Sequence, residues 1–333
     1  MPGRTVTQIT QRRAERHRQH IADIIMEKYT LLTNEPHITG LSMRPGGHDI
    51  YMYADDGSDF GMGGNKVRFY ECLIPKILEA QPEVLVSSGS MYSNHIRVTA
   101  LVASRLGLKC HIMISEEEGF CETENVRLAR EYGAVIHPVG HFAALLKIEE
   151  FVAELEQSGR RVYLVPNGGH TPEATRAYRD VTLNALSQLE SRGVHISTIF
   201  LPCASGTTHA GVLCAGAEMT LPEVISFTVA NKPKRAQKAI AALIDEAAAY
   251  NGGFYSQGLN ICVLDSGKND YGEPDAELLE LRRSLYETDG IELDATYNIN
   301  AFYGMIRYLE EHPGNSPVLY INTGGYTGPA LGQ

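Results

Sequence analysis

No two of the chain's six cysteines stand in a C-x-x-C pair, no apolar run is long, and positive charge is scarce. The cysteines, at positions 72, 110, 121, 203, 214 and 262, have no regular spacing, which is typical of reduced thiols in a cytoplasmic protein. No apolar run approaches the roughly 20 residues that a helix needs to cross a bilayer. The 29 lysines and arginines are outnumbered by 40 aspartates and glutamates, and the net charge of −11 disfavours a nucleic-acid partner. We therefore expect a cytoplasmic protein that binds neither membranes nor nucleic acids.

Several catalytic signatures are also missing. The twelve histidines show no H-E-x-x-H or other ligand spacing, and His17 and His20 fit an exposed helix face better than a metal site, so no metal is expected. There is no G-x-S-x-G elbow for α/β-hydrolase chemistry and no G-x-G-x-x-G dinucleotide fingerprint. Gly61–Lys66 (GMGGNK) differs from a Walker A loop because Asn65 separates glycine from lysine and no serine or threonine follows. Hydrolase, dinucleotide-binding and P-loop functions are therefore disfavoured.

The opening stretch, residues 1–20, is rich in arginine but has no hydrophobic signal-peptide core. It could mimic a transit peptide, but we favour a helix that docks on the rest of the protein. The sequence leaves open whether such a helix completes a neighbouring subunit's site or packs on its own domain.

Short β-branched runs alternate along the chain with longer segments whose apolar residues recur at helical spacing. The 333 residues, 43% of them hydrophobic, suffice for one large domain or two smaller ones. The expected strands are residues 49–53, 84–87, 110–114, 134–139, 161–165, 197–201, 223–229, 260–264 and 317–321. The expected helices are residues 66–80, 93–106, 122–132, 142–157, 173–191, 208–219, 233–250, 275–287 and 299–311. Strands that alternate with helices of this length predict an α/β protein with mostly parallel sheets covered by helices on both faces.

Glycine- and serine-rich loops follow several of the expected strands. They are Ser87–Ser90, Pro166–His170, Cys203–Gly211 and Thr323–Gly328. In open parallel sheets, ligands bind beyond the carboxyl ends of the strands, where loops lead into helix N-termini. So many permissive loops at one edge indicate a small-molecule site rather than an interaction scaffold.

Lys66 follows three glycines and begins an amphipathic helix. The positive end of a helix favours the neutral, nucleophilic form of a lysine, and Schiff-base chemistry with a carbonyl cofactor needs that form. Taken alone, however, a lysine in this pattern is more often a surface residue after a flexible turn.

Two further helix starts carry polar groups. Ala204–Gly211 (ASGTTHAG) follows an expected strand, and its small residues and hydroxyls could hold a cofactor's phosphate, although an ordinary glycine-rich turn has the same pattern. Ser93–Arg97 (SNHIR) also opens a helix, where serine and asparagine most often act as caps.

Taken together and in order, these segments resemble the fold-type II pyridoxal-phosphate enzymes, and most closely the branch of 1-aminocyclopropane-1-carboxylate deaminase and D-cysteine desulfhydrase. The branch's strand–loop–lysine segment is similar to IYMYADDGSDFGMGGNKVRFYECL, with Asp55, Asp56 and Gly63–Lys66 in register. Its Ser-Asn-His helix is similar to SNHIRVTALVASRLGL, and its phosphate loop to CASGTTHAGVLCAG. Its Tyr-Gly-x-Pro, Asp-Pro-Val-Tyr and Thr-Gly-Gly motifs match DYGEPD, ELDATYN and NTGGYTG. The resemblance covers roughly residues 49–328.

The resemblance implies a fold like that of the tryptophan synthase β subunit, with two three-layer α/β domains and pyridoxal 5′-phosphate in the cleft between them. Residues 1–66 plus 166–333 would form the large cofactor-binding domain, and residues 67–165 the small inserted domain. Lys66 would form the Schiff base and shuttle the substrate's α-proton, with Ser93, Tyr271 and Tyr297 as further catalytic residues. The other implied cofactor contacts are Asn94 at the 3′-oxygen, Ser205, Gly206, Thr207 and Thr208 at the phosphate, Thr323 near the pyridine nitrogen, and Asn298 beside it.

Asn298 stands where the cyclopropane deaminases place a glutamate that keeps the pyridine protonated. A neutral amide weakens the electron sink and disfavours opening of an unactivated cyclopropane ring, whereas elimination of a good leaving group demands less. His95, as in the desulfhydrase-like members, points the same way. We therefore expect a homodimeric lyase or deaminase that eliminates a Cβ substituent from a small amino acid, giving a keto acid and ammonia. The alternatives are a β-replacement synthase for an activated serine- or cysteine-type substrate, an amino-acid racemase, and a binding protein without catalysis.

Overall fold

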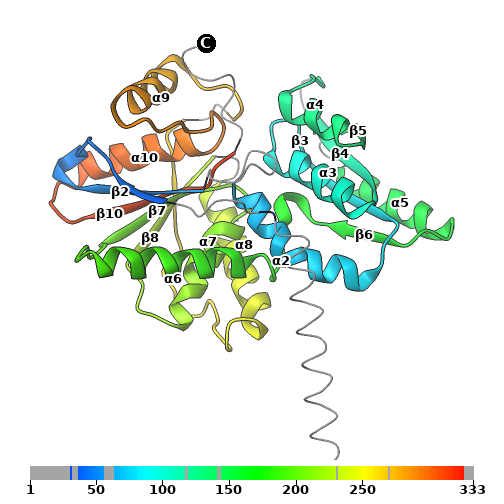
Figure 1. Cartoon of the computed structure of the whole chain (residues 1–333), viewed down its shortest axis with the longest axis horizontal. Coiled ribbons are helices and arrows are strands. Elements are labelled where there is room, and N and C mark those ends of the chain that lie inside the picture. Colours follow the sequence, from blue (N-terminus) through cyan, green and yellow to red (C-terminus); the bar gives the residue numbers. More distant parts are fainter. Residues whose placement is uncertain are drawn as a thin grey trace, which may run out of the picture.

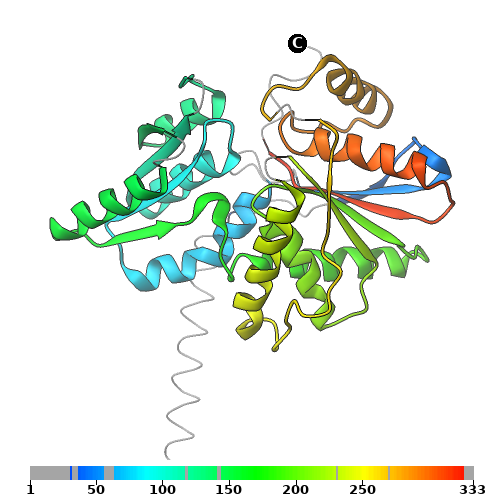
Figure 2. The same cartoon turned by 180° about the vertical axis from the view of Figure 1, so that it is seen from behind.

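The structure, a computed structural model, describes residues 31, 37–55, 64–116, 119–140, 144–229, 232–268 and 271–325. These residues form two α/β lobes, each built around its own sheet (Figure 1). Helix α2 (Asn65–Ala80) lies between the lobes, and the view from behind shows the same separation (Figure 2).

The larger lobe contains a six-stranded sheet in the order β1-β2-β10-β7-β8-β9. Its strands are β1 (His37–Gly40), β2 (Ile50–Ala54), β7 (Thr198–Cys203), β8 (Glu223–Thr228), β9 (Cys262–Asp265) and β10 (Val318–Asn322). All neighbouring pairs are parallel except β1 with β2. β10 lies between β2 and β7, with Val318 opposite both Ile50 and Thr198. The carboxyl ends of the parallel strands therefore share one edge of the sheet.

Helices cover both faces of the six-stranded sheet (Figure 1). One face carries α6 (Thr175–Ser191), α7 (Thr207–Cys214) and α8 (Pro233–Glu246), and the other carries α9 (Ala276–Asp289) and α10 (Asn298–Glu311). Side chains alternate along β7, because Ile199 and Leu201 pack in the core under α6 to α8 while Phe200 packs in the core under α10. Burial on both faces explains why these strands are almost entirely apolar.

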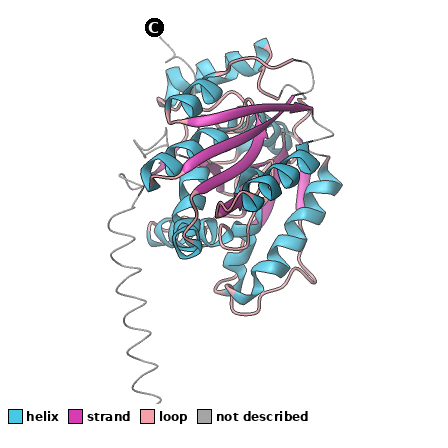
Figure 3. Ribbon diagram, turned by 90° about the vertical axis from the view of Figure 1, so that its right-hand side faces the viewer, coloured by secondary structure: helices cyan, strands magenta, loops and turns pink. Residues whose placement is uncertain are grey.

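The smaller lobe contains a four-stranded parallel sheet in the order β5-β4-β3-β6. Its strands are β3 (Val84–Ser90), β4 (Lys109–Glu116), β5 (Ala134–Gly140) and β6 (Val162–Val165). Its helices are α3 (Asn94–Leu106), α4 (Glu124–Glu131) and α5 (Ala144–Gln157). The side view shows the strands of the molecule framed by helices (Figure 3). Leu85 and Ile112 pack with α2 to α4 in one core, and Val86 and Met113 pack with α5 in another.

Helix α2 belongs to the cores of both lobes. Val67, Tyr70 and Leu73 pack in the core of the smaller lobe. Phe69, on another side of the helix, packs in the core of the larger lobe, where its ring centroid lies 6.1 Å from that of Tyr178. The helix that begins at the candidate lysine therefore joins the two sheets.

The structure confirms an α/β fold with mostly parallel sheets, and each expected strand and helix is present with ends shifted by a few residues. The sequence analysis missed β1, a four-residue edge strand that pairs antiparallel with β2. None of its residues is buried, so the sequence shows no apolar pattern there. The arginine-rich residues 1–20, Asp56 and Gly63 lie outside the described residues. In the described part of the chain, no helix combines the length and the apolar character needed to cross a membrane.

Candidate active site

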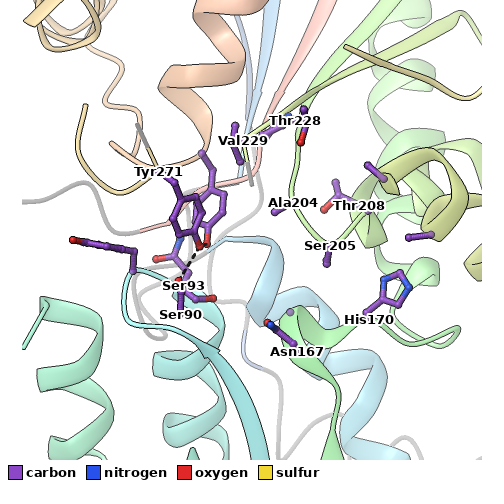
Figure 4. A pocket seen from close by; sticks show the side chains of 18 of the residues that line it. Ser90, Ser93, Asn167, His170, Ala204, Ser205, Thr208, Thr228, Val229 and Tyr271 are labelled. Atoms are coloured by element: carbon purple, nitrogen blue, oxygen red, sulfur yellow. Dashed lines mark hydrogen bonds between the residues drawn. The ribbon is translucent and has the colours of Figure 1, made fainter. Parts of the chain in front are cut away.

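A cleft of about 1480 Å³ lies between the two lobes. The smaller lobe contributes the loop after β3, and the larger lobe contributes the loops after β7 and β8 together with Tyr271 and Tyr297. Figure 4 shows Ser90 and Ser93 near Tyr271, with Ser205, Thr208 and His170 across the opening. The cleft lies beyond the carboxyl ends of parallel strands, where α/β proteins bind small ligands.

Lys66 lines this cleft from the first turn of α2. Two backbone hydrogen bonds fix the start of the helix: Gly64 N donates to the Asp55 carbonyl oxygen at 2.9 Å, and Asn65 N donates to the Thr323 carbonyl oxygen at 2.8 Å. Gly64 has a φ of 91°, and a Cβ there would lie 2.9 Å from the Thr323 carbonyl oxygen, so only glycine fits. The glycine before Asn65 thus allows β2, β10 and α2 to meet and places Lys66 at their junction.

The Lys66 amine is held in a partly apolar environment. Its Nζ donates a hydrogen bond to the Gly168 carbonyl oxygen at 2.9 Å and lies 4.7 Å from the centroid of the Phe69 ring. Burial lowers the pKa of Lys66 to about 7, and the positive end of α2 acts in the same direction. A large share of this amine is therefore neutral and nucleophilic near neutral pH.

The loop between β7 and α7 forms a cradle for an anion, defined by Ser205, Gly206, Thr207 and Thr208. Gly206, with a φ of 88°, caps α7 without a side-chain hydrogen bond, so the first N–H groups of the helix remain available to a bound anion. The hydroxyls of Ser205 and Thr207 lie 3.1 Å apart, and Asn65 Nδ2 donates to Thr208 Oγ1 at 3.0 Å. That last bond ties the anion cradle to the residue before Lys66.

Two half-buried tyrosines lie at the opposite end of the cleft. The hydroxyl oxygens of Tyr271 and Tyr297 are 2.5 Å apart, and Ser90 Oγ lies 3.0 Å from Tyr271 Oη (Figure 4). Burial raises the pKa of Tyr271 and raises that of Tyr297 well above its usual range. Both phenols are therefore protonated at neutral pH and can donate hydrogen bonds.

The residues at the start of α3 both cap the helix and line the cleft. Ser93 Oγ accepts a hydrogen bond from His95 N at 3.2 Å, so Ser93 is the N-cap, and both Ser93 and Asn94 line the cleft. His95 is fully buried, with Nε2 2.8 Å from Ser87 Oγ and its ring stacked on Tyr70. Burial lowers the pKa of His95 to about 3, which keeps the imidazole neutral.

Asn298 and Thr323 pack behind the wall of the cleft. Asn298 is fully buried, and its Nδ2 donates to Asp294 Oδ1 at 2.6 Å and to the Gly324 carbonyl oxygen at 3.1 Å. Its Oδ1 accepts from Thr323 N at 3.0 Å. Asp294 also accepts from the backbone N–H of Tyr297 at 2.8 Å, and burial raises the pKa of this carboxyl. Asn298 therefore links the start of α10 to the end of β10.

The structure brings most of the sequence-predicted residues into this one cleft. Its described lining includes Lys66, Ser93, Asn94, Ser205, Gly206, Thr208, Tyr271 and Tyr297. Thr207, Asn298 and Thr323 are not in that lining: Thr207 contributes its hydroxyl to Ser205 in the anion cradle, and the other two are hydrogen-bonded to each other.

Several residues of the site were not predicted. Gly168 and Ser90 lie in two of the glycine- and serine-rich segments, but that composition does not show which atom contacts Lys66 or Tyr271. The expected loop Ser87–Ser90 is in fact the end of β3. Asp294 had a usable signal, because a carboxylate a few residues before a helix often accepts its first N–H groups. Arg97 and Asn125, which contact Asn94, carry no local signal.

The sequence profile of the family described as pyridoxal-phosphate dependent enzyme matches residues 37–324. The chain belongs to this family. A D-cysteine desulfhydrase of Serratia proteamaculans is 31% identical over 305 residues, covering 86% of this chain and 88% of the relative. A candidate 1-aminocyclopropane-1-carboxylate deaminase of Pyrococcus abyssi is 29% identical over 320 residues, covering 92% and 94%. Among solved structures, an ACC deaminase homologue matches with a TM-score of 0.78 at 28% identity, covering 91% of this chain and 95% of that one. The predictions of fold type II and of pyridoxal phosphate as the cofactor are confirmed.

The described residues fit this pyridoxal-phosphate family's cofactor. A reactive amine and an anion cradle, the two groups that an aldehyde and a phosphate need, meet at Gly168. A Cβ at Gly168 would lie 3.0 Å from Ser205 Cβ and 3.8 Å from Lys66 Nζ, so the space between them depends on glycine. Lys66 would hold the aldehyde carbon, and the anion cradle would hold the phosphate.

The lowered pKa of Lys66 predicts how cofactor uptake depends on pH. The rate at which cofactor-free protein takes up pyridoxal phosphate is expected to rise with pH and to reach half its maximum near pH 7, because the neutral amine reacts. An exposed lysine would instead require a pH near 10.5. By linkage, the cofactor-free fold should gain stability as the pH rises between these values, since the unfolded chain keeps the proton there.

Stopped-flow absorbance between pH 5.5 and 10 measures this uptake, with Nα-acetyllysine as the control amine. A protein profile that still climbs steeply above pH 9 would contradict the prediction.

Proposed function

We propose that this chain is a lyase that catalyses α,β-elimination on a small amino acid of the cysteine type, releasing the β-substituent, a keto acid and ammonia. One observation carries this proposal: Lys66, the anion cradle and the Tyr271–Tyr297 pair all lie in one cleft. The likeness to proteins named D-cysteine desulfhydrase supports a thiol as the leaving group.

The chemistry divides between the cofactor and the protein. Pyridoxal phosphate, when bound, withdraws electrons from the α-carbon of an attached amino acid and so acidifies its α-proton. Lys66, with a pKa near 7, accepts that proton and can return it. The protonated hydroxyls of Tyr271 and Tyr297 donate a proton towards the leaving group. Ser93 places its hydroxyl in the lining and faces the substrate's carboxylate.

We also propose which residues of the cleft and of its wall would contact the cofactor. Asn94 would meet the 3′-oxygen, the anion cradle would hold the phosphate, and Thr323 with Asn298 would lie by the pyridine nitrogen. Asn298 is neutral, and both ends of its amide are already hydrogen-bonded, so it supplies no acid to the ring. This favours elimination of an activated substituent over opening of a cyclopropane ring.

The wider organisation is also proposed. Residues 1–66 plus 166–333 would form the large domain and 67–165 the small one, a division supported by the two separate sheets and by β6 ending at Val165. The family resemblance supports a homodimer, and the scattered cysteines support a cytoplasmic location.

The test follows three products of one reaction. D-cysteine and water should give pyruvate, ammonia and hydrogen sulfide in equal amounts, measured by lactate dehydrogenase coupling, glutamate dehydrogenase coupling and methylene blue. L-cysteine, O-acetylserine and 1-aminocyclopropane-1-carboxylate serve as competing substrates.

Tyr297→Phe should lower the rate by about 100-fold, because it removes a positioned proton donor. Tyr303→Phe is the matched control, since Tyr303 lies on α10, the helix that Tyr297 caps, but donates to Glu277 outside the described cleft lining. Keto acid from the cyclopropane substrate alone, or none from either cysteine, would overturn the proposal.

A further inference from the structure

We infer that Arg97 and Asn125 are positioning residues that fix the amide of Asn94 with its amino end towards the cofactor site. This inference rests on the proposed contact of Asn94 with the cofactor's 3′-oxygen. Arg97 follows Asn94 by one turn of α3, and Asn125 lies in the first turn of α4.

Two donors converge on one terminal atom of the Asn94 side chain. Arg97 Nη2 lies 3.3 Å from Asn94 Oδ1, and Asn125 Nδ2 lies 3.5 Å from the same atom. A guanidinium has donors and no acceptor, so the atom that it faces must be the amide oxygen. The opposite end of Asn94 is therefore the amino group, which is a hydrogen-bond donor and not an acceptor.

The geometry of the cleft agrees with that orientation. Asn94 lines the cleft and is 8% exposed, whereas His95, Ile96 and Arg97 after it are fully buried. A Cβ built on Gly325 would lie only 2.5 Å from Asn94 Nδ2, so the amino end of Asn94 faces the backbone of Gly325. The same segment, Thr323 to Gly325, packs against Gly64, two residues before Lys66. A donor at this place suits the 3′-oxygen of pyridoxal phosphate, which carries negative charge when ionised.

Asn125 is fixed in turn by its own contacts. Its Oδ1 accepts from Arg97 Nε at 2.9 Å, and its Nδ2 donates to the Tyr92 carbonyl oxygen at 3.0 Å. Thr123, the N-cap of α4, donates to the Met91 carbonyl oxygen. The start of α4 thus holds the loop just before α3, through Met91 and Tyr92, and no residue of α4 lines the described cleft.

Burying the charged side chain of Arg97 costs free energy, because the guanidinium loses its contacts with water. The side chain is fully buried, and a guanidinium is stable in such a place only when its N–H groups find acceptors. Two of those acceptors are Asn125 Oδ1 and Asn94 Oδ1. A methionine could fill the same space without that cost, but it could not orient an amide.

The test compares binding of two ligands and needs no turnover. Dissociation constants are measured by spectral titration for pyridoxal 5′-phosphate and for its 3-deoxy analogue, which lacks the 3′-oxygen. The unmodified protein should prefer pyridoxal phosphate by about 10-fold, the value of one hydrogen bond to a charged oxygen. Asn94→Ala should remove that preference.

Arg97→Lys keeps the charge but cannot hold both contacts, and it should reduce the preference to below about 3-fold. The double variant Asn94→Ala/Arg97→Lys should lose no more than Asn94→Ala alone, because both changes remove one interaction. Asn125→Ala, which removes the other donor to Asn94 Oδ1, should also reduce the preference for pyridoxal phosphate. Arg282→Met, which removes a buried arginine of the larger lobe that donates to Leu293, should keep the full preference.

A folded Arg97→Lys or Asn125→Ala protein that keeps the tenfold preference would overturn the inference, as would additive losses in the double variant. Because only binding is measured, a protein that shows the predicted pattern and yet forms no keto acid would contradict the proposed function and leave this inference standing.

Discussion

Replacement of Lys66 by alanine is expected to lower the rate of keto-acid formation from D-cysteine by at least about 1000-fold, since the residue serves both as nucleophile and as proton acceptor. Other lysines also line the described cleft, but Lys268 is paired with Asp275 and Glu277, and these carboxylates raise its pKa. Lys66 combines burial with a pKa lowered to about 7. The coupled assay for pyruvate measures the loss.

Borohydride reduction followed by peptide mass spectrometry gives an independent readout of the covalent bond. The unmodified protein should carry reduced cofactor on the peptide that contains Lys66, and Lys66→Ala should carry none. Lys234→Ala is the control, because Lys234 is exposed on α8 and is not in the described lining. Cofactor that remains covalently attached to reduced Lys66→Ala protein would contradict the assignment.

Replacement of Arg68 by methionine is expected to lower the free energy of unfolding by about 3–5 kcal/mol. Arg68 Nε lies 2.7 and 2.8 Å from the two carboxylate oxygens of Asp55, which is 2% exposed, and Tyr178 Oη donates to the same carboxylate at 2.6 Å. Loss of the guanidinium would remove a cation that contacts both oxygens of a buried carboxylate. Urea unfolding of the cofactor-free protein, followed by circular dichroism, measures the change.

The matched control is Arg283→Met. Arg283 pairs with Glu280 on the exposed surface of α9, where solvent screens an ion pair and its loss should change the free energy of unfolding little. Equal losses in the two variants would show that burial of the Asp55–Arg68 pair has no special effect. We also expect Arg68→Met to weaken cofactor binding, because the Asp55 carbonyl oxygen accepts from Gly64 N just before Lys66.

The sequence was sufficient for the periodic part of the fold. β7 is mostly apolar because both of its faces are buried, and α10 keeps its apolar residues at helical spacing, so both elements can be recognised from a short stretch of sequence. β1 is not visible in this way, since its four residues are partly or fully exposed and its partner comes later in the chain.

The candidate site likewise contains residues that local sequence patterns reveal and residues that they do not. Lys66 and the anion cradle are recognisable because glycine and a helix start leave local signals. The Arg97–Asn125 contact joins residues 28 apart on different helices, and Asp55 meets Tyr178 across 123 residues. Such pairs depend on how the helices pack, and one sequence taken by itself does not show which distant residues contact each other.

The position of β10 has a consequence for the order in which the protein can mature. The smaller lobe's strands come from one continuous stretch, whereas β10 forms the pairing between β2 and β7 in the larger sheet. A ribosome that has passed β8 has produced both flanking strands but not the one that separates them. Until Val318–Asn322 is made, Thr323 cannot accept the hydrogen bond that fixes the start of α2. We therefore expect cofactor loading to follow the synthesis of β10, when all strands of the smaller lobe have already been made.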